Sequence, residues 1–228
     1  MIVGESRLAS GGSRATLFDP TGNGNNTNLG TLGGLDSRAN SNNNNGDIVG
    51  YALDASGNPF ATLFDSTGNG NNISLGGLGE NHSMAYSIND SGDIVGYALA
   101  APGVSVATLF DPTGNGNNIS LGGLGGTSAV ALSINIAGLI VGNATDSSGN
   151  YRATLFDPTG NGNNIDLNTL ISPSLGWELR TANCINDDGW IVGGGINPDG
   201  HGEAFLLTPE PMTIILLSLG GLILRRKQ

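Results

Sequence analysis

The segment Ala-Thr-Leu-Phe-Asp, followed by one turn residue and Thr-Gly-Asn-Gly-Asn-Asn, decides the fold because it recurs almost unchanged. The pentapeptide occupies residues 15–19, 61–65, 107–111 and 153–157, so the period is 46 residues. Ile-Val-Gly recurs with the same period at residues 2–4, 48–50, 94–96 and 140–142, and returns at 191–193 after five extra residues. This self-similarity predicts a repeat architecture in which neighbouring units stack.

Within one period, four short apolar segments predict four strands, at residues 61–65, 72–75, 85–89 and 93–99. Gly, Asn, Asp or Pro bounds each segment. The turn at residues 89–92, Asn-Asp-Ser-Gly, lies between two apolar runs and predicts a hairpin. No helical period of ten or more residues occurs before residue 208, so the sequence predicts an all-β fold.

The number of strands in each period indicates which kind of repeat architecture the chain forms. Four strands in about 46 residues match the blade of a β-propeller, with a right-angled β-solenoid as the alternative. We therefore expect a repeat domain of about four and a half units over residues 1–208. Because residues 1–4 match the end of a unit, we expect this domain to be incomplete at its N-terminus, with a signal peptide further upstream. The alternative is that residues 2–7 pair with residues 204–207 and close a ring.

Composition excludes several classes of function. The formal net charge is −11 and the pI is about 4.2, which disfavours a nucleic-acid-binding surface. One Cys and two His exclude an internal disulfide framework and a zinc site built from Cys and His. Gly and Asn are abundant, with 39 Gly and 28 Asn among 228 residues, as expected for a chain rich in turns.

The last twenty residues, 209–228, differ from the repeats. They contain Pro-Glu-Pro, then 13 uncharged residues at 212–224, then a basic end. As a helix the apolar run would measure about 20 Å, which predicts a short transmembrane helix stopped by the basic residues. A buried helix and a plain tail anchor are the alternatives. The sequence features are Pro209, Glu210 and Pro211, and the membrane stop Arg225, Arg226 and Lys227.

Pro-Glu-Pro, an apolar stretch and a basic terminus in this order resemble the PEP-CTERM sorting signal of Gram-negative bacteria. The resemblance implies recognition by an exosortase in the inner membrane and cleavage near Pro209. It also implies export, transient membrane anchoring, and association with exopolysaccharide and biofilm at the cell surface or outside the cell.

The body resembles the HAF extracellular repeats. The matching stretches include residues 28–34 and 46–50, and residues 166–170, 185–187 and 191–193 in the closing unit. The His-Ala-Phe core of that family is absent, because the chain has Phe60-Ala61-Thr62 and Glu203-Ala204-Phe205 at those places. The resemblance implies no enzymatic activity and no catalytic residues.

The recurring Asp-x-Thr-Gly-Asn-Gly-Asn-Asn loop has oxygen-bearing residues at the first, third and fifth places and Gly at the sixth, as in a calcium loop. Its twelfth place is Gly122 in the third copy, where a calcium loop needs Glu. The loop is therefore predicted to be a plain turn, with weak calcium binding as the alternative. The candidate calcium ligands are Asp19, Asn23, Asp65, Asn69, Asp111, Asn115, Asp157 and Asn161.

The remaining reactive residue types do not form a recurring catalytic pattern. The carboxylates of the hairpins, Asp90, Asp93, Asp187 and Asp188, lack a recurring His, Cys or Lys partner, which favours a role in turns over acid–base catalysis. His82 and His201 lie in Gly- and Asn-rich loops and are expected to be exposed.

Cys184 takes the strand position of two serines and is expected to be a buried, inert thiol, with a free surface thiol as the alternative. Trp177 and Trp190 occur only in the last unit. They are expected to cap the stack, with platforms for a sugar ring as the alternative.

These observations predict an exported, non-enzymatic surface or matrix protein that contacts exopolysaccharide through many weak sites. A calcium-dependent glycan-binding or adhesive module is the second hypothesis. A propeller glycan lyase or hydrolase is the third, and the near identity of the units disfavours it, because an enzyme of that kind needs a non-repeating charged cluster.

Overall fold

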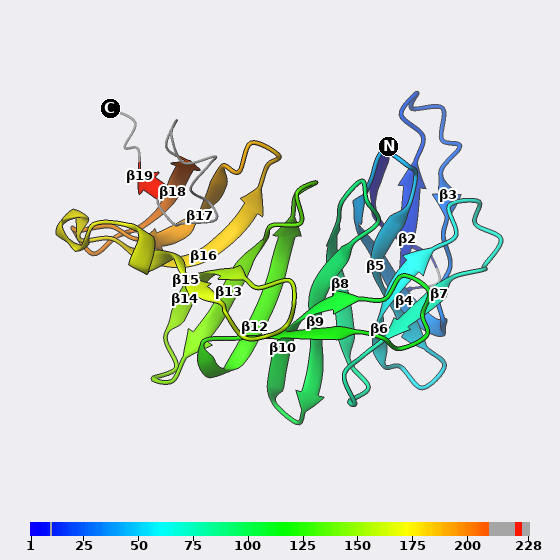
Figure 1. Cartoon of the computed structure of the whole chain (residues 1–228). Coiled ribbons are helices and arrows are strands. Elements are labelled where there is room, and N and C mark those ends of the chain that lie inside the picture. The colour runs from blue at the N-terminus through cyan, green and yellow to red at the C-terminus, as the bar shows by residue number, and fades with distance from the viewer. Residues whose placement is uncertain (10, 210–221, 225–228) are drawn as a thin grey trace. The chain divides into compact units, whose positions relative to one another are not determined.

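The structure is a computed structural model that describes residues 1–9, 11–209 and 222–224. The described chain is all-β and folds as two compact units, Met1–Ser120 and Leu121–Gln228 (Figure 1). All strand pairs are antiparallel, and none of the sheets formed by the described residues closes on itself. Each unit is described separately below.

The first unit contains three successive sheets, each built by strands that pair in chain order. The first sheet consists of β1 (Ile2–Arg7), β2 (Ser13–Phe18) and β3 (Thr27–Asn28). The second consists of β4 (Gly33–Asn42), β5 (Ile48–Asp54), β6 (Pro59–Phe64) and β7 (Ile73–Gly76). The third consists of β8 (Ser83–Ile88), β9 (Ile94–Ala101) and β10 (Val104–Phe110), with β11 (Ile119–Gly122) pairing with β10.

The second unit continues the same pattern with two sets of paired strands. The first set is β12 (Gly125–Ile134), β13 (Ile140–Asp146), β14 (Tyr151–Phe156) and β15 (Ile165–Asp166). Two short 3₁₀ helices, η1 (Leu167–Leu170) and η2 (Pro173–Leu175), follow. The second set is β16 (Glu178–Ile185), β17 (Ile191–Ile196), β18 (Gly202–Pro209) and β19 (Leu222–Leu224).

The predicted all-β fold and the four strands of each period are confirmed. The expected strands at residues 61–65, 72–75, 85–89 and 93–99 correspond to β6, β7, β8 and β9 with ends shifted by at most two residues. The predicted hairpin joins β8 to β9, and Gly92 N–H donates to the carbonyl of Asn89 over 3.1 Å. Helical structure among the described residues before 208 is limited to η1 and η2.

The central strand β5 is buried on both faces because the sheets of the first unit stack on one another. Ile48 and Val49 are neighbours in β5 and are both fully buried, but period-two alternation sends them to opposite faces. Ile48 packs with Ala15 and Leu29 of the preceding sheet, while Val49 packs with Ile94 of the following sheet. In the second unit, Val141 and Ala153 pack in the same way against Leu179, Ile185 and Phe205.

Ile-Val-Gly recurs because the edge strand beside it carries a β-bulge. In β8 the register shifts between Ala85 and Ser87, which brings the carbonyl of Met84 toward Gly96 in β9. A Cβ atom at Gly96 would lie 2.0 Å from that carbonyl oxygen, so only Gly fits. Gly50 and Gly142 meet the same obstacle in their own sheets, at 1.9 and 2.0 Å.

The expected transmembrane helix at residues 212–224 lies outside the described residues, except for Leu222–Leu224. Those three residues form β19 and pair with the end of β18, so the helix prediction is wrong for them. Pro209 is the last residue of β18, whereas Glu210, Pro211, Arg225, Arg226 and Lys227 lie outside the described residues. No helix in the described part of the chain is long and apolar enough to cross a membrane.

We predict that Gly96→Ala lowers the free energy of unfolding by about 3 kcal/mol, because the new methyl group overlaps the Met84 carbonyl and the bulge must move. Gly202→Ala is the control, since a Cβ atom there meets nothing within 4 Å. Chemical denaturation followed by circular dichroism measures both. Equal midpoints for the two variants would contradict this explanation of the motif.

Candidate functional site

Each repeat presents an exposed loop organised by one aspartate. In the third copy, Asp111 Oδ1 accepts hydrogen bonds from the Thr113 amide at 2.9 Å and the Thr113 hydroxyl at 2.6 Å. Asp111 Oδ2 accepts from the Asn117 amide at 3.3 Å and the Asn117 side-chain Nδ2 at 3.0 Å. The carboxylate therefore holds both arms of the loop, in the manner of an Asx turn.

These donors stabilise the ionised form of the carboxylate. The Thr113 hydroxyl first, and then the Thr113 amide, lower the pKa of Asp111 from 3.8 to about 2, against the opposing effect of desolvation. The pKa of Asp157 falls to about 2 for the same reason, through Thr159. The carboxylates of Asp19 and Asp65 are also shifted downward.

The loop also connects its repeat to the repeat before it. Asn118 Oδ1 accepts from the Asp111 amide at 2.8 Å, and Asn118 Nδ2 donates to the carbonyls of Leu75 and Gly77 at 2.8 and 3.2 Å. Gly114 has a φ of 71°, and a Cβ atom there would lie 2.7 Å from Ile73 Cγ2. Gly at this place thus satisfies both the turn and the close packing on β7.

The same bonds recur in the other copies. Asn72 Nδ2 donates to the carbonyls of Leu29 and Thr31, and Asn164 Nδ2 donates to those of Leu121 and Gly123. The threonine hydroxyl lies 2.5–2.6 Å from the aspartate Oδ1 in every copy, in the pairs Thr21–Asp19, Thr67–Asp65, Thr113–Asp111 and Thr159–Asp157. The four loops are therefore alike in structure as well as in sequence.

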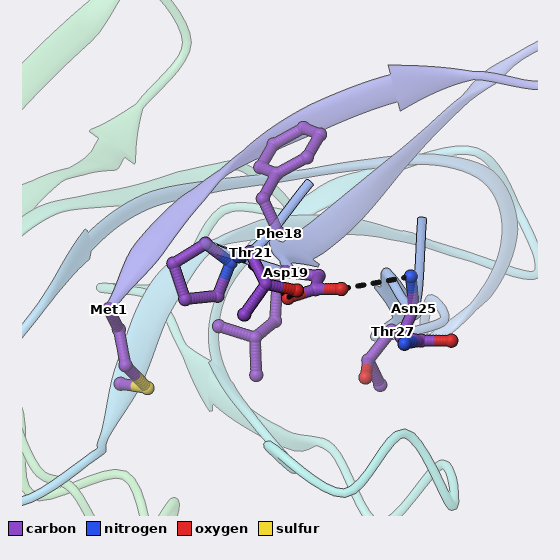
Figure 2. A pocket seen from close by; sticks show the side chains of 8 residues that line it. Met1, Phe18, Asp19, Thr21, Asn25 and Thr27 are labelled. Carbon is purple, nitrogen blue, oxygen red and sulfur yellow. Dashed lines mark hydrogen bonds between the residues drawn. The ribbon is translucent and has the colours of Figure 1, made fainter. Parts of the chain in front are cut away.

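Hollows of similar size lie beside three of these loops in the first unit. Their volumes are about 580, 530 and 580 Å³. Figure 2 shows the first, where the Asp19 carboxylate lies between Met1 and Asn25, and the Phe18 ring projects from the strand beside Asp19. The other two are lined by Phe64, Asp65, Thr67 and Ile73, and by Phe110, Asp111, Thr113 and Ile119, among others. Each hollow thus combines a carboxylate, a hydroxyl and amides with apolar side chains.

The predicted calcium ligands lie in these loops, one aspartate and one asparagine in each. Asn23, Asn115 and Asn161 donate Nδ2 to the threonine hydroxyl at 2.9 Å, so the threonine separates them from the aspartate. Among the described residues, no group of three or more His, Cys, Asp or Glu side chains gathers in a way that could hold a metal ion. Each loop by itself offers one carboxylate, and the turn donors already engage both of its oxygens.

The hairpin carboxylates join successive repeats. Asp90 accepts from the Asn44 amide at 2.9 Å and from Asn44 Nδ2 at 2.7 Å. In the second unit, Asp187 Oδ1 accepts from the Ile136 amide at 3.0 Å. Asp90 and Asp187 therefore link neighbouring repeats, a role that the sequence did not predict.

Two expectations about reactive side chains are wrong. Cys184 is exposed together with its cross-strand partner Val192, whereas Ser133 and Val141 at the same places in the preceding repeat are buried. The difference arises because none of the described residues covers this face of the last sheet as β16 covers β13. His82 is half-buried, and its Nε2 lies 2.8 Å from the Tyr97 hydroxyl. His201 is exposed, as expected.

The two tryptophans differ in environment. Trp177 is partly buried against the core of the second unit, as a cap would be, whereas Trp190 is 47% exposed.

Comparison of the chain with protein-family models, with curated proteins and with solved structures finds no match.

We predict that Thr113→Ala raises the pKa of Asp111 toward 3.8, because the variant loses the shortest hydrogen bond to the carboxylate. Since the folded-state pKa is depressed, the carboxylate stabilises the loop above pH 3.8, and this stabilisation disappears as the pH falls toward 2. Carboxyl ¹³C NMR titration measures the shift. Asn115→Ala is the control, because Asn115 bonds to Thr113 and not to Asp111; equal shifts in both variants would refute the assignment.

Proposed function

We propose that the chain is part of an exported, non-enzymatic surface or matrix protein that associates with exopolysaccharide. The observation that carries this proposal is the recurrence of one exposed polar loop in four repeats, with the same internal hydrogen bonds. A polymer of repeating sugars offers matching groups at intervals. Weak contacts made by several loops at once give an avidity far above that of any single loop.

The hollows beside the loops suit such a ligand. Each contains Asp and Thr oxygens and Asn amides, which can exchange hydrogen bonds with sugar hydroxyls. Each also contains a Leu-Phe pair from the strand end, and the second and third hollows contain Ile73 and Ile119, which can contact the apolar C–H groups of a pyranose ring. Pockets that recognise small molecules commonly combine apolar walls with a few polar groups.

We further propose that the repeats are propeller-like blades, with a β-solenoid as the alternative. Two features favour blades. In the first unit, strands pair in chain order within each repeat, and successive sheets pack face to face through Ile48 and Val49. A solenoid would instead pair strands of neighbouring repeats side by side.

The C-terminal sequence supports the route of export. Pro209, Glu210, Pro211, the apolar run and the basic end resemble the PEP-CTERM signal, so an exosortase in the inner membrane is the proposed processing partner. The acidic body, which carries −13 over residues 1–208 from 5 basic and 18 acidic residues, is expected to lie outside the membrane.

We predict that the native protein from fractionated cells ends near Pro209 when the exosortase is present, and retains Arg225 to Gln228 when it is deleted. Intact mass spectrometry of the membrane and extracellular fractions measures this. An unprocessed chain in the membranes of both strains would mean a simple tail anchor, and a chain found in the cytoplasm would end the export proposal.

A calcium-dependent glycan-binding or adhesive module is the second candidate. The observation that favours it is the close grouping of a carboxylate, a hydroxyl and an amide in each loop. One carboxylate in each loop predicts dissociation constants in the millimolar range. We expect a calcium-dependent rise in melting temperature that is smaller in Asp65→Asn/Asp111→Asn than in the unmodified chain. Equal melting temperatures with and without millimolar calcium would dismiss this candidate.

A further inference from the structure

The repeats differ from one another in one short segment. Residues 61–79 and their copy 107–125 differ at one of nineteen positions, Ser66 against Pro112. The next seven residues, 80–86 and 126–132, differ at six of seven. This variable segment of the second repeat contains His82, Met84 and Tyr86, where the third repeat has Ser128, Val130 and Leu132.

The β-bulge places one of the variable side chains at the edge of the sheet. The register of β8 skips Tyr86, between Ala85 and Ser87, so this residue has no partner position in β9. Bulges at the same place in the equivalent strands β4, β12 and β16 skip Asn40, Leu132 and Asn183. The bulge is thus the same in each of these repeats, whereas the side chain at the bulged position differs between them. Bulges of this kind often redirect a side chain beside a functional site.

Three of the four tyrosines of the chain lie around this bulge, with a histidine and an arginine. The ring centroids of Tyr86 and Tyr97 are 6.0 Å apart, with an angle of 22° between their planes. His82 lies 5.7 Å from Tyr97 between centroids and shares a 2.8 Å hydrogen bond with its hydroxyl. Both tyrosines are half-buried, so each ring is held in place and still reaches the surface. Rigid aromatic side chains give contact area at little cost in conformational entropy.

Arg38 adds a positive charge to the group. It pairs in register with Tyr51 between β4 and β5, which puts both side chains on one face. Asn40, two residues along β4, donates Nδ2 to the carbonyl of Ala85 at 2.8 Å and so fixes β4 beside the bulge. Burial raises the pKa of Tyr86, and the nearby charge of Arg38 opposes this rise, consistent with their proximity.

The Arg38 guanidinium is exposed and makes no ion pair or side-chain hydrogen bond with any residue that the structure describes. By contrast, Arg152 pairs with Asp146 and Glu178, and Arg180 pairs with Glu178. A guanidinium left unpaired in a strongly acidic chain is available to an anionic ligand. Its planar fork matches a carboxylate best.

We propose that Arg38, Tyr51, His82, Tyr86 and Tyr97, the tyrosine cluster, form a binding site for a uronic acid residue of a polysaccharide. The Tyr86 ring takes the apolar C–H face of the pyranose, and the Arg38 guanidinium takes the C6 carboxylate in a bidentate pair. Tyr97 and His82 hold the Tyr86 ring in place. This site deepens the proposed association with exopolysaccharide, since it names the kind of sugar.

The net negative charge of the chain does not prevent this contact. Charges farther apart than about 8 Å are screened at physiological ionic strength, whereas a carboxylate paired directly with a guanidinium is screened much less. We therefore expect binding of a short uronate oligomer to survive at about 0.15 M salt.

The test uses the purified full chain and tetramers of glucuronate, galacturonate and mannuronate, with the matching neutral hexose tetramers as reference. Calorimetry gives the dissociation constants, and NMR reports shifts of the tyrosine ring resonances. We expect at least one uronate tetramer to bind and to shift the rings of Tyr86 and Tyr97, with its neutral match about tenfold weaker. Binding that is equal for acidic and neutral tetramers, or absent for all of them, would overturn the proposal.

Single-residue variants distinguish side chains that recognise the sugar from side chains that only pack within the protein. Arg38→Gln should weaken uronate binding about tenfold and abolish the preference for the acid. Tyr86→Leu, which installs the residue of the third repeat, should also weaken binding about tenfold, whereas Tyr86→Phe should keep it. Arg180→Gln and Tyr151→Leu, which change an exposed arginine and an exposed tyrosine elsewhere, should leave it unchanged.

The melting temperature of each variant distinguishes a side chain that only stabilises the fold from one that contacts the sugar. If Tyr86→Leu and Tyr86→Phe bind equally, or if Tyr86→Leu lowers only the melting temperature, the cluster is packing and the proposal fails. Failure here would leave the export proposal standing, because binding is measured on the isolated chain and does not depend on processing at Pro209.

Discussion

The side chain of Asn118 makes three hydrogen bonds at once, and the stacking of the repeats depends on bonds of this kind. Its oxygen closes its own loop at Asp111, while its nitrogen reaches two carbonyls of the preceding repeat, at Leu75 and Gly77. Carbonyls at the end of an edge strand would otherwise need water or another partner. One residue type at one position therefore fixes the shape of the loop and its attachment to the neighbour.

A second constraint acts at the opposite edge of each sheet. The bulge in β8 brings a carbonyl against β9, and Gly96 leaves the space that this approach requires. The core between the sheets is then filled by small and branched side chains such as Ile48, Val49 and Ala61, all fully buried. Asparagine at one edge and glycine at the other thus hold a thin apolar layer between successive sheets.

Much of this fold could be predicted from the sequence. The period, the strands and the hairpins follow from local patterns, because Ile, Val and Phe favour strands while Asn-Asp-Ser-Gly favours a turn. The role of Asn118 could not be predicted in this way, because its partners lie 41 and 43 residues away. The exposure of Cys184 could not be predicted for a related reason: its position matches the buried Ser133, but burial there depends on a following repeat, which the last sheet lacks among the described residues.

The candidate sites divide between constant and variable parts of the repeat. The loops of Asp19, Asp65, Asp111 and Asp157 recur with the same geometry, so the sequence predicted them as a set. The tyrosine cluster was missed because its members come from four strands of two sheets and from the connection that contains His82. Only the pairing of those strands and the packing of the two sheets bring them together. Its one signal in the sequence is a departure from the repeat, at residues 80–86.

The identical joints between repeats have a consequence for how this protein can evolve. Asn72 joins its repeat to the one before it by the same bonds that Asn118 uses. A recombination event that inserts or deletes one whole 46-residue unit therefore recreates the same joint on either side, without misfolding the neighbours. The length of the repeat array and the number of its loops can therefore change in a single recombination event. Substitutions at the bulge, by contrast, alter what one repeat recognises.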